Sequence, residues 1–192
     1  MSRKLFVITG PSGIGKSYLM TTLLGRYPDR FEVPKLLTTR AARPGEQAID
    51  REFISEEQFT RMAQNGEFAW TDSFYDNHYG YTQQALQPSQ RHILINALPP
   101  MIEEFANLPH AVVVGLTVLP ENFELIKRRL ELRGDPADAV FKRLSALSQD
   151  VAIMQDVQGT IAQHGKLFEI VDNDSVETVV DWLRYNYLDH EH

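Results

Sequence analysis

The sequence contains no cysteine among its 192 residues, and this absence excludes several classes of protein. A chain without thiols forms no disulfide framework, has no thiolate nucleophile and offers no Cys-ligated metal site. It has no apolar stretch long enough to cross a membrane, and residues 1–5 show no signal-peptide architecture. We therefore expect a cytoplasmic protein that does not associate with a membrane.

The chain also lacks an excess of basic residues. Its 19 lysines and arginines are outnumbered by 26 aspartates and glutamates, so the net charge is −7. This balance argues against nucleic-acid binding, which depends on basic side chains that neutralise phosphates. Basic residues do gather locally between residues 127 and 143. Such a cluster suits either a solvated helix face or a site for a small anion.

Repeats and low-complexity linkers are missing too, and 43% of the residues are hydrophobic, as in an ordinary globular protein. The length predicts one compact domain with an insertion. Apolar runs at residues 5–8, 93–95, 112–114 and 167–171 alternate with helical patterns. Most of these runs are continuous, as in strands that a parallel sheet buries on both faces. The pattern predicts an α/β fold with right-handed crossovers.

Capping residues mark the expected helix starts. Asp135 as N-cap and Pro136 at the first helical position predict a long amphipathic helix. Asp174, with Glu177 three residues later, predicts the start of the last helix. Between residues 34 and 88 the strand–helix rhythm breaks, and we expect an inserted subdomain with a short helix that Ser55 caps.

One motif carries specific chemistry. Residues 10–17 read Gly10-Pro11-Ser12-Gly13-Ile14-Gly15-Lys16-Ser17 and fit the phosphate-binding pattern G-x-x-x-x-G-K-[ST]. The glycines let backbone N–H groups surround phosphate oxygens, and the following helix adds the positive end of its dipole. Lys16 would reach the β- and γ-phosphates, and the Ser17 hydroxyl would ligate Mg²⁺. The motif therefore predicts a site for ATP and Mg²⁺.

Three further features favour a kinase over a nucleotide-dependent switch or motor. The chain is small, it has no N-K-x-D motif that would read guanine, and its basic cluster comes late in the sequence. A mobile lid there could bring arginines onto the transferring phosphoryl group. Phosphoryl transfer depends mostly on positioning and charge neutralisation, so such arginines would carry much of the catalysis.

The residues resemble the guanylate kinase family over essentially the whole chain. The resemblance rests on the P-loop, Thr38-Thr39-Arg40-Ala41-Ala42-Arg43-Pro44-Gly45-Glu46, His78-Tyr79-Gly80, Arg129, Arg133-Gly134, Arg143-Leu144 and Ile170-Val171-Asp172-Asn173-Asp174. It implies a P-loop kinase whose parallel core sheet, flanked by helices, comes from residues 1–33, 89–132 and 164–192. An acceptor-binding insertion would span about 34–88, and a helical lid about 133–163.

The resemblance also implies roles for individual residues. Lys16, Arg133 and Arg143 would be catalytic, and Arg129 and Asp172 would join the P-loop in binding ATP. The resemblance implies Arg40, Arg43, Glu46 and Tyr79 as acceptor-binding residues, and we expect Arg51, Trp70 and Asn96 to join them at positions where the chain departs from the family. For the first two there is an independent argument, because guanidiniums three residues apart beside Pro44-Gly45 can converge on one dianion.

The chain departs from the family where the family reads guanine. Trp70 stands where the family has a glutamate, Tyr81 where it has serine or threonine, and Ile95 or Asn96 where it has an aspartate. The N1–H and N2–H groups of guanine require an acceptor, whereas an indole offers only a donor. The sequence therefore predicts that the phosphate contacts are kept and that the base is read weakly.

Three functions stay open on this reading. The first is phosphorylation of GMP by ATP, giving GDP and ADP. The second is phosphorylation of ribose 1,5-bisphosphate, because kinases of that class are similar in a tryptophan near Trp70 and in the strand Ile93-Leu94-Ile95-Asn96. The third is an inactive interaction module of guanylate kinase type, which the P-loop lysine and lid arginines disfavour. The sequence predicts no oligomeric state.

Overall fold

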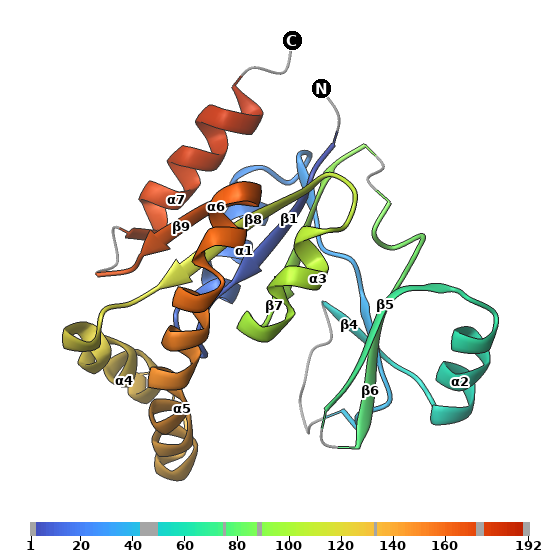
Figure 1. The fold of residues 1–192 in the computed structure, drawn as a ribbon, viewed down its shortest axis with the longest axis horizontal. Helices are drawn as coiled ribbons and strands as arrows, with labels where there is room; N and C mark the ends of the chain where they lie inside the picture. Colours follow the sequence, from blue (N-terminus) through green and yellow to red (C-terminus); the bar gives the residue numbers. More distant parts are fainter. Residues whose placement is uncertain are drawn as a thin grey trace.

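The structure is a computed structural model, and it describes residues 3–42, 50–74, 76–87, 90–132, 134–171 and 175–189. Its main sheet has five strands in the order β2-β7-β1-β8-β9, all parallel to their neighbours (Figure 1). These strands are β1 (Leu5–Thr9), β2 (Phe31–Glu32), β7 (His92–Ala97), β8 (Ala111–Thr117) and β9 (Gly165–Glu169). The predicted α/β fold with a parallel core sheet is confirmed.

Helices cover both faces of this sheet. They are α1 (Lys16–Arg26), α3 (Ile102–Ala106), α4 (Phe123–Leu132), α5 (Ala137–Asp156), α6 (Gln158–His164) and α7 (Ser175–Leu183), with short turns η1 (Pro99–Met101), η2 (Pro120–Asn122) and η3 (Arg184–Leu188). Helices α1 and α7 pack on one face, and α3 and α6 on the other. The pair α4 and α5 projects beyond the sheet (Figure 1). None of the helices in the described ranges is long and apolar enough to cross a membrane.

Strand β1 is buried on both of its faces. Phe6 and Ile8 belong to the cluster that α1 and α7 complete, whereas Leu5 and Val7 belong to the cluster that α3 and α6 complete. Successive side chains of a strand point to opposite faces, so a strand between two helix layers needs apolar residues at every position. This explains the continuous apolar run at residues 5–8 and confirms that prediction.

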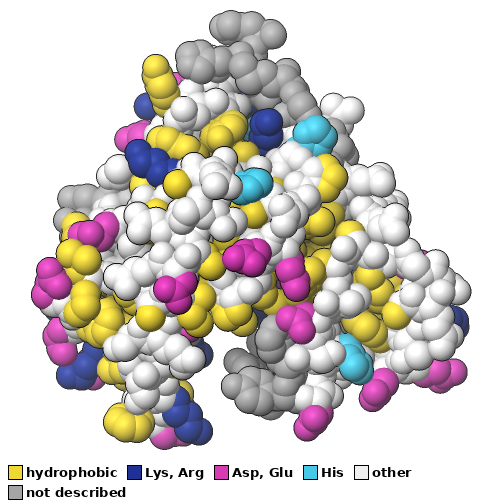
Figure 2. All heavy atoms as spheres, in the orientation of Figure 1, with side chains coloured by type: hydrophobic (Ala, Val, Ile, Leu, Met, Phe, Trp, Pro, Cys, Tyr) yellow, Lys and Arg dark blue, Asp and Glu magenta, His cyan; other side chains and the backbone are white. Residues whose placement is uncertain are grey.

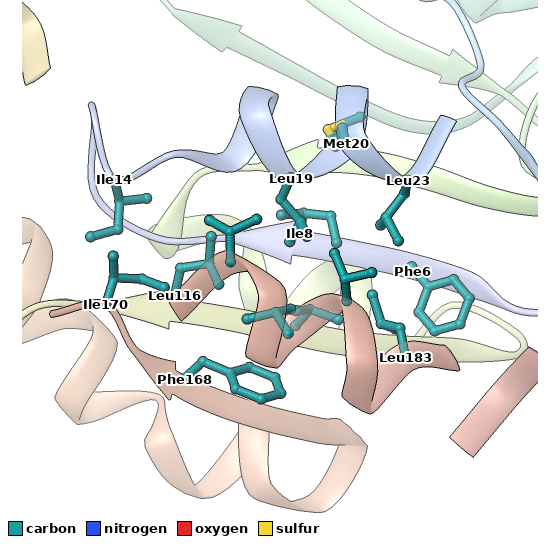
Figure 3. Close-up of a cluster of buried hydrophobic side chains, with 14 of the residues drawn as sticks. Phe6, Ile8, Ile14, Leu19, Met20, Leu23, Leu116, Phe168, Ile170 and Leu183 are labelled. Atoms are coloured by element: carbon teal, nitrogen blue, oxygen red, sulfur yellow. The ribbon is translucent and has the colours of Figure 1, made fainter. Parts of the chain in front are cut away.

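The larger cluster fixes α1 and α7 against the sheet. Figure 3 shows Leu19 and Leu23 of α1 and Leu183 of α7 pointing into this cluster, with Leu23 and Leu183 beside Phe6. All four side chains are fully buried. Burying one large apolar side chain contributes about 1.5–3 kcal/mol, so this layer is a main source of stability near the start of α1.

A second, four-stranded sheet lies beside the first, on the right of Figure 1. Its order is β4-β3-β6-β5, from β3 (Leu36–Thr38), β4 (Arg51–Phe53), β5 (Phe68–Phe74) and β6 (Asn77–Thr82). Helix α2 (Glu56–Gln64) precedes β5, and its N-cap is Ser55, whose side chain accepts a hydrogen bond from the Gln58 N–H. The predicted short helix and its cap are confirmed.

The start of α5 differs from the expectation. The helix begins at Ala137 with Pro136 as its N-cap residue, so Asp135 does not cap it. The Asp135 carboxylate instead lies 3.5 Å from Nε of Arg143, two turns into the helix. A full charge on Arg143 is a stronger partner for the carboxylate than a terminal amide. The amphipathic pattern is confirmed, since Val140, Leu147, Val151 and Met154 are buried, whereas Leu144 of the same predicted stripe is only partly buried.

The starts of β9 and α7 also differ from the sequence prediction or lie beside undescribed residues. The last strand runs from Gly165 to Glu169 and so starts two residues earlier than the apolar pattern indicated. Gly165 allows this early start, because a Cβ there would lie 1.7 Å from the Val113 carbonyl oxygen. The expected cap Asp174 lies outside the described residues, and α7 is described from Ser175.

His92 is the one histidine buried at the amino end of the main sheet among the described residues. Its Nδ1 accepts a hydrogen bond of 3.0 Å from the Lys4 N–H, and its ring lies edge-on to Phe6. Burial, together with the nearby cations Arg3 and Arg30, lowers the pKa of His92 from 6.5 to about 4. The ring is therefore neutral in the folded protein at neutral pH.

We expect this histidine to make the protein less stable in mild acid. A group whose pKa is lowered on folding stabilises the fold above its unfolded pKa, and this stabilisation is lost as pH falls from about 6.5 toward 4. One pKa unit is about 1.4 kcal/mol, which shifts Tm by about 3–6 °C in a chain of this size.

The measurement is Tm by circular dichroism between pH 4 and 8. His92→Asn keeps an acceptor for the Lys4 N–H and removes the titration, so its Tm should fall less between pH 7 and pH 5 than that of the wild type. His110→Asn is the control, because His110 is exposed and its φ of 62° suits asparagine. Equal acid sensitivity of all three proteins would contradict the assignment.

Candidate active site

The phosphate-binding motif lies at the carboxyl end of β1, between that strand and α1. This is the edge at which open parallel sheets bind ligands. Gly10 has φ +143°, and a Cβ there would lie 2.2 Å from the Leu116 carbonyl oxygen, so only glycine fits. Ile14 is fully buried near Leu116 and Ile170 and anchors the loop in the core (Figure 3). The loop is therefore fixed at Gly10 by its close approach to Leu116 and at Ile14 by burial in the core.

Lys16 is buried inside this loop. Its Nζ donates hydrogen bonds to the carbonyl oxygens of Gly10 at 2.6 Å and Pro11 at 2.9 Å. Burial lowers the pKa of Lys16 from 10.5 to about 8, while Asp150 raises it and Arg143 lowers it. A cation with an easily lost proton thus lies at the centre of the motif.

Helices α4 and α5 bring two arginines to the loop. Nη1 of Arg129 donates to the Ile14 carbonyl oxygen at 3.4 Å, and Nη1 of Arg143 donates to Oγ of Ser12 at 3.0 Å. Both line a pocket of about 680 Å³. The other residues that line it are Ser12, Gly13, Gly15, Lys16, Ser17, Tyr18, Asn96, Leu98, Leu130 and Val176. Lys16 therefore meets two arginines that lie more than 100 residues further along the chain at one cavity, which suits a polyanion.

Asn96 is the predicted acceptor-binding residue that lies in this pocket. It is the fifth residue of β7 and pairs with Ile8 of β1, so it stands one step before the carboxyl end of the sheet. Its amide can donate and accept hydrogen bonds beside the P-loop.

Other predicted acceptor-binding residues lie in the second sheet. Arg40 follows β3, and its guanidinium lies 5.2 Å above the ring of Phe53. Arg51 begins β4 and forms an ion pair with Asp50, with an Nε–Oδ1 distance of 3.1 Å. Tyr79 of β6 is half-buried. The predicted site residues Arg43, Glu46, Arg133 and Asp172 lie outside the described residues.

Trp70 occupies a different kind of position, because it joins the second sheet to the helix layer of the first. It is 9% exposed, and its ring lies 4.9 Å from Phe105 of α3 and 6.0 Å from Tyr81. Its indole N–H donates a hydrogen bond of 2.7 Å to Oε2 of Glu104. The donor that the sequence analysis identified is thus already engaged by a carboxylate 34 residues away.

Sequence reasoning missed two acidic residues near these groups. One is Glu104, which holds Trp70, and the other is Asp150, which accepts a hydrogen bond of 3.3 Å from the Ser12 N–H. The available signal for Asp150 was its place seven residues after Arg143, which puts both on one side of a helix. No comparable signal existed for Glu104.

We expect the protonation of Lys16 to control binding of polyphosphate anions. The affinity for inorganic tripolyphosphate should fall by up to about tenfold per pH unit above a pH of about 8, because the free lysine must first regain its proton. Lys16→Met should weaken binding at pH 7 by about 10- to 100-fold, the value of a hydrogen bond to a charged group, and remove this pH dependence.

Isothermal titration calorimetry between pH 6 and 9.5 measures this affinity. Lys35→Met, which removes an exposed lysine, should bind as the wild type does. Unchanged binding by Lys16→Met would show that the anion does not meet this side chain.

Comparisons with known proteins agree with this geometry. The family model for guanylate kinase matches residues 2–188. The guanylate kinase of Trichormus variabilis is 35% identical over 158 residues, covering 78% of this chain and 77% of that protein. The guanylate kinase of Shewanella oneidensis is 32% identical over 195 aligned positions, covering 94% of this chain and 84% of that protein.

A solved structure shows that the fold is shared. The guanylate kinase of Anaplasma phagocytophilum matches with a TM-score of 0.66 and 22% identity, over 98% of this chain and 88% of that one. Together with the family match over nearly the whole sequence, this places the phosphate-binding motif in the setting where it works as part of a nucleotide kinase. The chain therefore belongs to the guanylate kinase family and is an ATP-binding phosphotransferase.

Proposed function

We propose that this protein transfers the γ-phosphoryl group of ATP to the phosphate of a nucleoside monophosphate, with GMP as the first acceptor. The observation that carries the proposal is the meeting of Lys16, Arg129 and Arg143 at one pocket beside the P-loop. The relatives named as guanylate kinases support GMP as the acceptor. The same cluster argues against an inactive interaction module, which would have no use for these cations.

The residues at the pocket would act mainly by electrostatics. The loop N–H groups and the start of α1 would hold the β-phosphate, and Lys16 would exchange its two carbonyl partners for phosphate oxygens, which bind an ammonium more strongly. Arg129 and Arg143, with Arg133 as a further proposed member, would neutralise charge that develops during transfer. The nucleophile is an ionised phosphate oxygen of the acceptor, so the reaction needs no general base.

The donor set at the pocket fits magnesium as the metal that accompanies ATP. The described residues hold no group of three His, Asp or Glu side chains that could form a protein cage for a metal. Mg²⁺ instead keeps several waters and binds substrate phosphates with one or two protein oxygens. The exposed Ser17 hydroxyl, which lines the pocket in the first turn of α1, is such an oxygen. When bound, the ion would neutralise phosphate charge.

The proposed acceptor site lies between this pocket and the second sheet. Arg40 and Arg43 would bind the acceptor phosphate, with Glu46, Arg51, Tyr79 and Asn96 around it. Trp70, which is 9% exposed and has its N–H bound by Glu104, would support the acceptor site by packing rather than by a hydrogen bond to the acceptor. The burial of Trp70 and Tyr81 against Phe105 also favours a phosphorylated ribose as a second candidate acceptor, because neither side chain presents a carboxylate to a base.

We expect the kcat/KM values for different acceptors to differ only weakly. The kcat/KM values for GMP, AMP, CMP, UMP and ribose 1,5-bisphosphate, with ATP and Mg²⁺, measure it. The ratio of GMP to AMP should be about 10- to 100-fold smaller than in a relative with glutamate at the Trp70 position, because such a contact contributes about 1.5–3 kcal/mol. An exclusive preference for GMP would mean that another group reads guanine.

Arg40→Ala should raise KM by about 10- to 100-fold for every one of these acceptors, because the lost contact is to the shared phosphate. Arg61→Ala removes an exposed arginine of α2 and should change no KM value. A loss confined to one acceptor would reassign Arg40 to base recognition.

Arg143→Ala should lower kcat by about 10²-fold or more while changing the affinity for ATP much less, because charge develops on the phosphoryl group only during transfer. Lys142→Ala, at the exposed neighbouring position, is the matched control. Single-turnover rates and ATP titrations separate the two effects. An unchanged single-turnover rate in Arg143→Ala, together with weaker ATP binding, would remove this residue from the catalytic group.

A further inference from the structure

The second sheet meets the core at a small aromatic junction. Trp70 of β5 and Tyr81 of β6 are direct neighbours across the hairpin, and both contact Phe105 of α3. The Trp70 and Phe105 rings are centred 4.9 Å apart, and the Tyr81 and Phe105 rings 6.2 Å apart. All three side chains belong to the buried cluster that also contains Val7 of β1. The core of the main sheet therefore continues into the second sheet at this junction.

The second sheet and α2 form a lobe beside the core (Figure 1). Figure 2 shows a notch between this lobe and the projecting pair α4 and α5. Because the notch separates the lobe from α5, the place of the lobe relative to the P-loop depends on contacts such as those at α3.

Glu104 of α3 adds a directional contact to this junction. Its Oε2 accepts a hydrogen bond of 2.7 Å from the indole N–H of Trp70, whose side chain is 9% exposed. Apolar packing has no preferred direction, whereas a hydrogen bond to a carboxylate is strong and oriented. A buried indole N–H also needs a partner. The carboxylate therefore favours one orientation of the Trp70 ring among those that packing alone would allow.

On the core side, this hydrogen bond starts from a segment that reaches the phosphate pocket. Asn96 and Leu98 line that pocket, and only the turn η1 separates Leu98 from α3. Ile102 and Phe105 are buried in the core, so α3 has a fixed place relative to the pocket. Glu104 is thus presented to the second sheet from a rigid element.

On the side of the second sheet, Trp70 is connected to residues of the proposed acceptor site. Tyr79 lies two positions before Tyr81 on β6, so both side chains point to the same face of the strand, and Tyr79 packs against the same cluster. Tyr79 also pairs with Thr38 at the end of β3, and Arg40 follows two residues later. The strands that carry these side chains therefore take their place from the junction at Trp70.

We propose that Glu104 is a positioning residue for acceptor binding, which holds the Trp70 indole against α3 and so sets the place of the acceptor-binding strands relative to the phosphate pocket. The inference rests on the proposed function, because Tyr79 and Arg40 bind the acceptor there. In this role Glu104 acts through Trp70 and not on the substrate. Its loss should weaken acceptor binding and leave the P-loop as it is.

Four variants separate the parts of this role. Glu104→Ala removes the acceptor of the indole N–H, whereas Glu104→Gln keeps an acceptor oxygen without the charge. Trp70→Phe keeps a ring at the junction and removes the donor. Glu103→Ala removes the exposed neighbouring carboxylate of α3 and is the control. Circular dichroism establishes that each variant is folded and gives its Tm.

The first readout is KM for GMP and AMP at saturating ATP. In Glu104→Ala both values should rise about 3- to 10-fold, the net contribution of one hydrogen bond. KM for ATP and kcat should stay near their wild-type values, as should all constants of Glu103→Ala, and Glu104→Gln should lie closer to the wild type than Glu104→Ala. A purely structural role would lower Tm without this split between the two substrates. A folded Glu104→Ala with wild-type KM for both acceptors would overturn the proposal.

The second readout is the double variant of Glu104→Ala and Trp70→Phe. Both substitutions remove the same hydrogen bond, so their effects on acceptor KM should not add, and the double variant should have the KM of Trp70→Phe alone. Additive effects would show that Glu104 does not act through Trp70 and would overturn the proposal. If one of the two single variants does not fold, the other decides the question through the split between acceptor and ATP.

This proposal and the proposed function fail in different ways. A wild-type protein that transfers phosphate to none of the acceptors tested would overturn the proposed function. The role of Glu104 is then decided by the dissociation constant of GMP in isothermal titration calorimetry, which needs no transfer and should still rise in Glu104→Ala and not in Glu103→Ala. A wild-type protein that neither phosphorylates nor binds any of these acceptors would overturn both proposals.

Discussion

The close approach of the P-loop to β8 is the constraint on which the rest of the site depends. Gly10 turns the chain against the Leu116 carbonyl, and Ile14 then enters the core between Leu116 and Ile170. With the loop fixed at these points, its carbonyl oxygens face inward and can receive the Lys16 ammonium. The start of α1, the pocket and the contacts of both arginines all follow from this one path of the backbone.

The cost of this arrangement is electrostatic. Burial lowers the pKa of Lys16, and the positive charge of Arg143 also lowers it, while Arg129 lines the same pocket. Two carbonyl oxygens accept hydrogen bonds from Lys16, the negative charge of Asp150 favours the protonated lysine, and Asp135 forms an ion pair with Arg143. A site that is positive and rigid before its ligand arrives is well suited to stabilise a polyanionic transition state, because little reorganisation is needed.

The two sheets are joined by aromatic packing. Trp70 and Tyr81 from the second sheet meet Phe105 of α3, and the hydrogen bond from Trp70 to Glu104 adds a polar contact to this junction. Side chains at these positions therefore contribute to how the second sheet sits against the core. Arg40 and Tyr79, which we propose bind the acceptor, lie on the same strands or next to them, so this packing would also position the proposed acceptor site.

Local patterns in the sequence determined the parallel sheet, the P-loop and the capped helix at Ser55, because each depends on periodicity or on residues a few positions apart. The same patterns identified the cations of the site. They did not predict that Arg129 would donate to the Ile14 carbonyl or that Arg143 would donate to the Ser12 hydroxyl. Tertiary structure alone decided that Asp135 pairs with a side chain instead of capping α5, that Glu104 binds Trp70, and that Asp150 reaches the P-loop. Each of these contacts forms because packing brings two distant segments of the chain within hydrogen-bonding distance. A pattern within one segment does not determine that distance.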